Sequence, residues 1–368
     1  MRYTMLPSQR DLFDMPREIC FLNAASYSPL PRKTLEAGRA AVGRKGQPWK
    51  LPGGFANGLH ERTRAAAARL INADPDDVAL ISSVAYGVAT AAKLFTIPRG
   101  SRVLVLENDH SSPVLEWQAR AETQGFAVET VRQPEDGDWT SAVLTAIERP
   151  GAPPVGVASI SSVHWSDGGL IDVERVSAAL KRQGAMFLID ATHAVGVLAV
   201  DVKALDPDFL IFPTYKWLLG PYGRAFVYVA KRHQNGVPLE QTAHGRRDIN
   251  SERDVYFADV AYVANARRFD MGERDHFISM EMAAISMGDD GGVGRGRGGA
   301  AAKDADGADR GGLATYRRAH GGGKVPRAAS SESVFQRRHA GRIGGGAGRR
   351  GHPCRAPLGA HAHLAACL

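Results

Sequence analysis

Reactive side chains follow four apolar, strand-like runs of this sequence. Asp190 comes directly after "AMFLI", Lys216 follows "DFLIF" 26 positions later in the chain, and Asp109 and His110 follow "SRVLVLEN". A turn of small residues at 82–85 follows "DVALI" and leads into a predicted helix. A carboxylate, an amine, an imidazole and a turn rich in backbone N–H groups could together bind a charged planar cofactor and perform acid–base or nucleophilic catalysis.

Each of these groups has an ordinary structural explanation when it is taken alone. A strand-end aspartate commonly caps a helix, a loop lysine is commonly solvated, and a Ser-Ser turn is more often a cap than a phosphate site. The combination is more informative, because pyridoxal phosphate needs a lysine for a Schiff base, a carboxylate at its pyridine nitrogen, a flat group over its ring and backbone N–H groups for its phosphate. An ion pair with Asp190 would raise the pKa of that nitrogen.

The elements that must position these groups alternate between strands and helices from residue 55 onward. Apolar runs predict seven strands, at 77–83, 101–107, 126–132, 155–163, 185–190, 208–212 and 224–230. Amphipathic stretches between them predict helices at 57–71, 86–95, 112–124, 139–148 and 172–183. This alternation is typical of an α/β domain with a mostly parallel seven-stranded sheet and helices on both faces, in which ligands bind at the carboxyl ends of the strands.

Four ordered motifs resemble the class V aminotransferases, the fold type I group that also includes cysteine desulfurases, selenocysteine lyases, kynureninases and isopenicillin N epimerase-like proteins. The motifs are "SVAYGVATAA" (83–92), "SSVHWSDGGLIDV" (161–173), "LIDATHAVG" (188–196) and "FPTYKWLLGPYG" (212–223). The resemblance covers roughly three quarters of the chain. It implies the fold type I transferase fold and pyridoxal 5'-phosphate as the cofactor.

The resemblance also implies roles for individual residues. Lys216 resembles the Schiff-base lysine that would move the α-proton of the substrate, Asp190 the pyridinium partner, and His110 the ring-stacking group, and these three are the expected catalytic residues. His193 occupies the position near the phenolic oxygen of the cofactor. The other expected cofactor contacts are Ser83, Val84, Ala85, Trp165, Thr214 and Tyr215.

Three further positions qualify the resemblance. Trp165 stands where many desulfurases carry Asn, which argues against that subgroup. The motif "FDMGERD" (269–275) resembles the loop that reaches the partner subunit's cofactor, so a homodimer is implied, although Glu273 and Arg274 replace the usual Thr-Pro. Asn23 is a candidate for the substrate side of the pocket, and its alternative is a turn residue before Pro29.

The C-terminal 81 residues differ in composition from the rest of the chain. Residues 288–368 contain 14 Lys and Arg residues but only 6 Asp and Glu residues, whereas residues 1–287 contain 32 Lys and Arg and 33 Asp and Glu. The same 81 residues also contain 20 of the 41 glycines. Such a segment buries too little apolar surface to fold and is expected to be mostly disordered.

Arg-Gly segments can bind single-stranded nucleic acid, but the near absence of aromatic residues disfavours that interpretation. The favoured interpretation is a one-base frameshift after Met287 that replaced the native C-terminal domain, and "RGHPC" with Cys354 is then a chance match to a desulfurase loop.

The expected organisation has four parts. Residues 1–54 form an N-terminal segment bordering the active site, 55–260 the large cofactor-binding domain, 261–287 the start of a small C-terminal domain, and 288–368 the tail. The resemblance implies that a small C-terminal domain would supply an arginine for the substrate carboxylate, and the tail stands in the place of that domain. No apolar run approaches the twenty or so residues of a membrane span, and three scattered cysteines indicate neither a disulfide framework nor a metal site, so a cytoplasmic protein is expected.

The expected function is that of a class V aminotransferase-type enzyme that acts on an amino acid through a lysine aldimine of pyridoxal phosphate. Within the same family, a lyase, a cysteine desulfurase or an epimerase remains an alternative, because these enzymes share the cofactor. From other classes, the chain could be an inactive relic, or it could bind nucleic acid through its basic tail.

Overall fold

The computed structural model describes residues 8–246 and 261–288. Its seven strands are β1 (Val78–Ile81), β2 (Arg102–Leu106), β3 (Ala127–Val131), β4 (Val155–Ser161), β5 (Met186–Asp190), β6 (Phe209–Pro213) and β7 (Ala225–Val229). Its α-helices are α1 (Arg32–Lys45), α2 (Phe55–Leu70), α3 (Val84–Leu94), α4 (Ser111–Gln124), α5 (Trp139–Glu148), α6 (Val173–Arg182), α7 (Val202–Leu205) and α8 (Phe277–Ser286).

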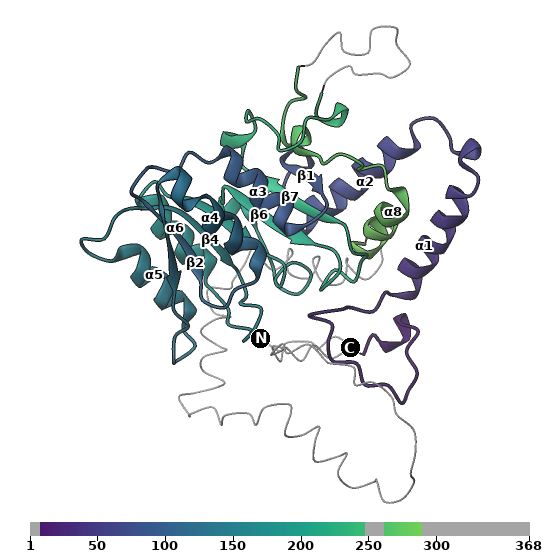
Figure 1. Ribbon diagram of the computed structural model, residues 1–368. Helices are drawn as coiled ribbons and strands as arrows, with labels where there is room; N and C mark the ends of the chain where they lie inside the picture. The colour runs from purple at the N-terminus through teal and green to yellow at the C-terminus, as the bar shows by residue number, and fades with distance from the viewer. Residues whose placement is uncertain (1–7, 247–260, 289–368) are drawn as a thin grey trace, which may run out of the picture. The chain divides into compact units, whose positions relative to one another are not determined.

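The strands form one sheet in the order β1-β7-β6-β5-β4-β2-β3 (Figure 1). Strand β7 runs antiparallel to both of its neighbours, β1 and β6, and the other neighbouring strands pair in parallel. The prediction of a mostly parallel seven-stranded sheet is therefore confirmed. Because the parallel strands share one direction, β1, β2, β4, β5 and β6 bring the residues that follow them to the same edge.

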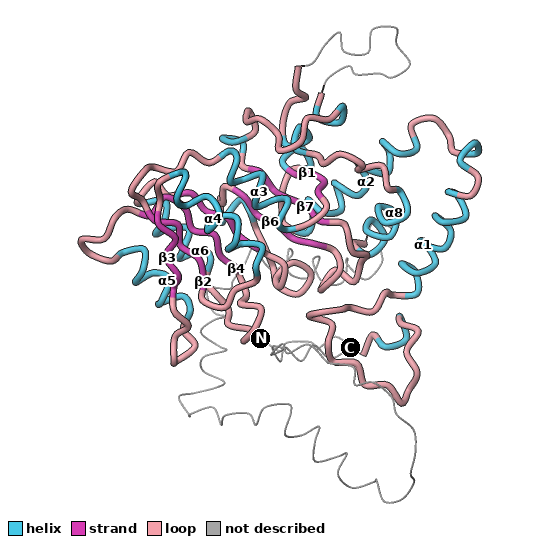
Figure 2. The backbone as a smooth tube through the Cα atoms, in the orientation of Figure 1, coloured by secondary structure: helices cyan, strands magenta, loops and turns pink. Residues whose placement is uncertain are grey.

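Two apolar layers cover the two faces of the sheet. Side chains alternate between faces along each strand, so Ile81 and Val105 join the layer under α3 and α4, whereas Leu80 and Leu104 join the layer with α2, α5 and α6. Burial of both faces explains why β1, β4, β6 and β7 are mostly apolar runs in the sequence. Figure 2 shows helix and strand segments interleaved through this part of the chain.

Side-chain caps explain where most helices begin. Ser83, Asp138 and Asp172 each accept a hydrogen bond from the backbone N–H three residues later, and α3, α5 and α6 begin directly after them. Helix α4 ends where Gly125 adopts a left-handed conformation with φ +76°. These local signals account for the close agreement between the predicted helices and the observed ones.

Helix α1 lies outside the predicted helices. It begins after Pro31 without a side-chain cap, and it contains two glycines, so its own sequence gives a weak helical signal. Its stability comes from packing against α8, where a Cβ on Gly38 would lie 2.8 Å from the Met282 sulfur. A close helix–helix contact therefore holds a segment that local propensity does not specify.

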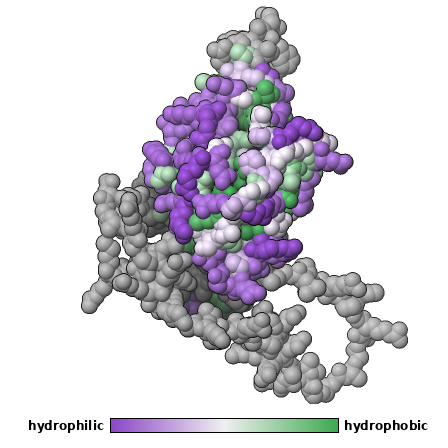
Figure 3. Space-filling view, turned by 90° about the vertical axis from the view of Figure 1, so that its left-hand side faces the viewer, coloured by the Kyte–Doolittle hydropathy of each residue, from purple (hydrophilic) through white to green (hydrophobic). Residues whose placement is uncertain are grey.

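The face of the molecule seen in Figure 3 is largely hydrophilic and carries apolar side chains only in small groups. Within the described residues, no helix combines the length and the apolar character that crossing a membrane requires. The expected cytoplasmic location stays a prediction. The expectations about the tail, the frameshift and Cys354 concern residues outside the described ranges, apart from Gly288.

Candidate active site

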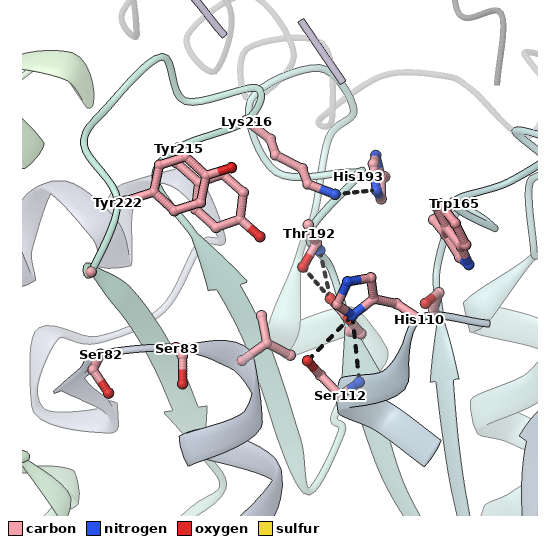
Figure 4. A pocket seen from close by; sticks show the side chains of 14 residues that line it. Ser82, Ser83, His110, Ser112, Trp165, Thr192, His193, Tyr215, Lys216 and Tyr222 are labelled. Carbon is pink, nitrogen blue, oxygen red and sulfur yellow. Dashed lines mark hydrogen bonds between the residues drawn. The ribbon is translucent and has the colours of Figure 1, made fainter. Parts of the chain in front are cut away.

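A cavity of about 320 Å³ opens at the carboxyl ends of the strands (Figure 4). The predicted site residues that line it are Ser83, Val84, His110, Trp165, Asp190, His193, Tyr215 and Lys216. Ser82, from the predicted turn at 82–85, also lines it, and the remaining lining residues were not predicted: Ser112, Ser161, Thr192, Tyr222 and Gly223. Motifs separated by more than 130 positions thus meet in one cavity, as the strand order requires.

Lys216 presents a buried amine to this cavity. Its Nζ lies 2.9 Å from Nε2 of His193, which follows β5 in the neighbouring loop. Burial lowers the pKa of Lys216, and the nearby carboxylate of Asp190 partly opposes that shift. Burial and the Lys216 charge lower the pKa of His193 to about 3. The site therefore favours a neutral imidazole and promotes the uncharged, nucleophilic form of the lysine.

Asp190 ends β5 and is almost fully buried. Its Oδ1 accepts the backbone N–H of Thr192 at 2.9 Å and also the hydroxyl of Thr192, while no donor among the described residues reaches Oδ2. Burial raises the pKa of Asp190, with the Thr192 hydrogen bonds and the Lys216 charge acting in the opposite direction. The carboxyl therefore has room and an energetic reason to accept a cationic donor.

His110 caps α4 and borders the cavity. The backbone N–H of Ser112 donates to its Nδ1 at 3.4 Å, and the ring meets Trp165 edge to face with centroids 6.0 Å apart. Trp165 is itself fixed, because its Nε1 donates to the carbonyl of Asn108 at 2.6 Å. Burial and the charge of Lys216 lower the pKa of His110, whereas Asp190 raises it. A neutral imidazole thus borders the cavity beside an indole that is hydrogen-bonded to the backbone.

The first turn of α3 provides free backbone donors. Ser83 Oγ accepts the N–H of Tyr86 at 3.1 Å, which leaves the N–H groups of Val84 and Ala85 without an intrahelical acceptor. An 11-residue helix also presents the positive end of its dipole there. This turn can therefore bind an anionic group.

Three predicted contacts are not among the residues that line the cavity. Ala85 has an exposed side chain, and its predicted contact is through its backbone N–H at the start of α3. Thr214 is fully buried, and its hydroxyl donates to the carbonyl of Pro221 at 2.5 Å, inside the turn between β6 and β7. Asn23 is exposed, and its carbonyl accepts the N–H of Tyr27 at 3.0 Å. This geometry matches the alternative interpretation of Asn23 as a turn residue.

A second compartment of about 170 Å³ adjoins the first. Ala25 and Ser26 form one wall of it, so the segment before α1 does border the cavity. Tyr215 and Tyr222 stack with ring centroids 3.8 Å apart and planes 16° from parallel. This stacked pair gives the compartment a rigid aromatic wall.

Asp109 was singled out at a strand end in the sequence, but no role in the site was predicted for it. Its carboxylate accepts the hydroxyl of Ser161 at 2.8 Å and the N–H of His110 at 2.7 Å. Burial, with the nearby charge of Asp190, raises the pKa of Asp109 to about 6. The sequence signal that could have assigned Asp109 to the site was its position directly before His110, at the end of a strand.

The loop at 269–275 is held within its own chain. The guanidinium of Arg64 donates to Asp270 at 2.7 Å, with both side chains fully buried, and Arg274 also pairs with Asp270. Glu273 adopts a left-handed conformation with φ +54°. In the described chain, Arg274 therefore stabilises a buried carboxylate, and the cross-subunit contact implied for this loop stays a prediction.

The lining fits pyridoxal phosphate in three respects. The cofactor carries an aldehyde, a basic ring nitrogen and a phosphate, which match the amine of Lys216, the open Oδ2 of Asp190 and the donors at the start of α3. The buried carboxyl of Asp190 is the most informative of the three, because a buried carboxylate without a cation is costly and a pyridinium would offset that cost.

Comparisons with known proteins agree with this assignment. The family model for aminotransferase class V matches residues 23–266. An uncharacterized aminotransferase of Bacillus subtilis, YcbU, is 28% identical over 238 residues, which are 62% of this chain and 57% of that protein. A probable cysteine desulfurase of Pyrococcus abyssi is 30% identical over 176 residues, 47% of this chain and 42% of that protein. The match thus spans about half the length of these relatives.

Solved structures share the fold at lower identity. A mutant of C-DES with glycine covalently linked to its PLP cofactor superimposes with a TM-score of 0.67 at 18% identity, over 80% of this chain and 77% of that one. The sheet and its flanking helices therefore form the fold type I architecture.

Proposed function

The chain belongs to the class V aminotransferase family, and we propose that it is a pyridoxal-phosphate-dependent enzyme that removes the amino group of an amino acid, with Lys216 as the reacting amine. The observation that carries the proposal is that the buried amine of Lys216 and the buried carboxyl of Asp190 line one cavity without a hydrogen bond between them. Structural lysines and aspartates at such depth normally pair with each other or with other charges, whereas Asp190 keeps an oxygen open to the cavity.

The residues around the cavity divide the work between them. When bound, pyridoxal phosphate supplies an electron-withdrawing ring that labilises bonds at the α-carbon of an amino acid. Asp190 would hold the ring nitrogen protonated, and the first turn of α3 would hold the phosphate. His110 would lie over the ring. Lys216, once free as an amine, would take the α-proton of the substrate and return it at another atom.

The test is covalent attachment of the cofactor. Wild-type protein mixed with pyridoxal phosphate should develop a visible absorbance band that borohydride bleaches, and peptide mapping should place the pyridoxyl group on Lys216. Lys216→Ala should show neither the band nor the adduct. Lys231→Ala, which removes an exposed lysine outside this cavity, is the matched control and should behave like wild type. A bleachable band in Lys216→Ala would refute the assignment.

A lyase or desulfurase reaction on cysteine is the second candidate, because curated relatives include a probable cysteine desulfurase. Among the described residues the free cysteine is Cys20, which is exposed and does not line the cavity, so this part of the chain offers no thiol to accept sulfur. Release of sulfide or alanine from cysteine would favour the second candidate. Release of a keto acid, with the cofactor left in its amino form, would favour amino transfer.

We also propose that the protein is a homodimer. Leu22, Tyr27 and Trp49 in the segment around α1 have exposed fractions of 78%, 66% and 76%. Large apolar side chains gathered in one segment are a common mark of an interface. Light scattering after size exclusion should give twice the chain mass, and a monomer at micromolar concentration would contradict the proposal.

A further inference from the structure

A chain of two hydrogen bonds leads from an indole to the reactive amine. Trp217 Nε1 donates to Nδ1 of His193 at 3.3 Å, and Nε2 of the same imidazole lies 2.9 Å from Nζ of Lys216. Figure 4 shows the second of these contacts, with His193 and Lys216 pointing toward each other over the cavity.

The direction of these hydrogen bonds determines which ring nitrogen of His193 carries its proton. An indole N–H can only donate, so Nδ1 of His193 must be the acceptor. A neutral imidazole that accepts at Nδ1 carries its proton on Nε2. That N–H can then donate only to an atom with a lone pair, and Nζ of Lys216 has a lone pair only as an uncharged amine.

We propose that Trp217 is a positioning residue: by donating to Nδ1 it selects the Nε2–H tautomer of His193, which in turn holds Lys216 as a neutral amine ready to react with an aldehyde. The inference rests on the function proposed for Lys216 and adds a residue that supports it. Trp217 itself is not among the residues that line either of the two cavity compartments.

The backbone around Trp217 keeps in place the hydrogen-bond relay formed by Trp217, His193 and Lys216. The indole residue is 5% exposed. Gly196, in the same loop as His193, has φ +102°, and a Cβ there would lie 2.8 Å from the carbonyl oxygen of Trp217. Only a glycine allows the two loops to approach this closely, so the donor and the imidazole are held together.

Charged groups around the amine act in both directions. Asp190 at the end of β5 favours the ammonium form of Lys216. Burial favours the neutral amine, and His110 at the start of α4, together with His164 after β4, acts on His193 in the direction of the neutral ring. The hydrogen bond from Nε2 of His193 also favours the neutral amine of Lys216. This bond forms only when His193 is the Nε2–H tautomer.

The first test observes the tautomer directly in the cofactor-free chain. Nitrogen-15 NMR of histidine-labelled protein, with His193→Leu used to assign the signal, should show Nε2 protonated and Nδ1 unprotonated from pH 6 to 8. A ring protonated at Nδ1, or at both nitrogens, in the wild type would overturn the proposal. This measurement does not depend on cofactor binding, so it separates failure of the relay from failure of the proposed function.

The second test measures how fast the cofactor attaches. The rate at which the visible band of pyridoxal phosphate appears, followed against pH, reports the fraction of neutral Lys216. Trp217→Phe keeps an aromatic ring but removes the donor, so we expect the rate at pH 7 to fall about fivefold, the equivalent of one ordinary hydrogen bond, and the profile to shift to higher pH.

A double-mutant cycle distinguishes the relay from simple packing. In the His193→Leu background the relay is absent, so adding Trp217→Phe should change neither the rate nor its pH profile. An equal loss in both backgrounds, or an unchanged tautomer and profile in Trp217→Phe, would overturn the proposal. If Trp217→Phe does not fold, the wild-type tautomer decides the question.

Discussion

Asp109 and Asp190 lie on either side of Ser161, at the ends of neighbouring strands. The hydroxyl of Ser161 donates to Asp109 at 2.8 Å, while the backbone of Ser161 pairs in register with Asp190. Each carboxyl is in a buried environment, and the charge of Asp190 helps to raise the pKa of Asp109 to about 6. The cavity therefore has two carboxyl groups beneath it, and a cationic cofactor ring would relieve the repulsion between them.

The first prediction concerns pH and Asp109. Its pKa in the folded chain, about 6, is above its value of 3.8 in a model compound. A raised acid pKa stabilises the fold below the unfolded pKa, and that contribution is lost as the pH rises through the folded pKa. The Asp109 contribution to the unfolding free energy of cofactor-free protein should thus decrease between about pH 4 and pH 6, by at most about 3 kcal/mol, whereas His193, whose pKa is lowered, contributes in the opposite direction. Denaturant titrations at several pH values measure it.

Asp109→Asn removes this contribution, so the unfolding free energy of the variant relative to wild type should increase between about pH 4 and pH 6. The comparison uses the slope with pH, because an asparagine also changes the hydrogen bonds to Ser161 and His110 by a pH-independent amount. Glu135→Gln, at an exposed loop position, is the control and should keep the wild-type slope. An Asp109→Asn profile parallel to wild type would show that Asp109 titrates normally.

The second prediction separates stability from binding at Asp190. Burial raises the pKa of this carboxyl, so its ionisation works against folding at neutral pH when no cation is present. Asp190→Asn keeps an acceptor for the N–H of Thr192 and should leave the cofactor-free chain at least as stable as wild type. Affinity for pyridoxal phosphate should nevertheless fall about 100-fold or more, because breaking a buried ion pair costs roughly 3–5 kcal/mol. Unchanged affinity in an absorbance titration would remove Asp190 from the proposed site.

Local signals were sufficient to predict most of the fold. Helix α5 spans Trp139–Glu148 as predicted, because Asp138 caps its start and Arg149-Pro150 ends it. Each observed strand overlaps its predicted run, and most of the strands are short, buried and apolar, whereas β3 at the edge of the sheet is partly exposed. Helix α1 could not be predicted in this way, since its stability depends on α8, which is far away in sequence.

Parts of the site depended on contacts that no local pattern encodes. Asp109 and Ser161 are 52 positions apart, and their hydrogen bond exists only because β2 and β4 are neighbours. The stacking of Tyr222 on Tyr215 depends on the turn after β6, which also buries Thr214. Motif positions therefore located the cavity, while the orientation of each side chain was set by tertiary packing.

The third prediction uses the cap of α3. Ser83→Ala removes the acceptor for the Tyr86 N–H and should cost about 1 kcal/mol of stability. It should also weaken binding of both pyridoxal phosphate and inorganic phosphate, because the same turn presents the free donors. Asp172→Ala, which removes the cap of α6, is the matched control: a similar stability loss with unchanged affinity is expected. Equal affinity losses in the two variants would mean that the effect is general.

The last prediction concerns how closely α3 packs on the sheet. A Cβ on Gly87 would lie 2.8 Å from Cδ1 of Ile211 and 3.0 Å from Cδ1 of Ile81. Gly87→Ala should therefore destabilise the protein by about 1–3 kcal/mol through overpacking and should weaken cofactor binding by displacing the start of α3. Gly58→Ala in α2, where a Cβ meets nothing within 4 Å, should instead stabilise by about 0.5–1 kcal/mol.

Ile211 provides the decisive comparison for Gly87. In the wild type, Ile211→Val removes Cδ1 from a filled core and should cost about 1 kcal/mol. In the Gly87→Ala background the same change removes the nearest of the clashing atoms, so it should partly restore stability and affinity instead. The sign of the Ile211→Val effect must therefore reverse between the two backgrounds. If it is destabilising in both, contact with Ile211 is not what requires glycine at position 87, and the start of α3 is positioned by other contacts.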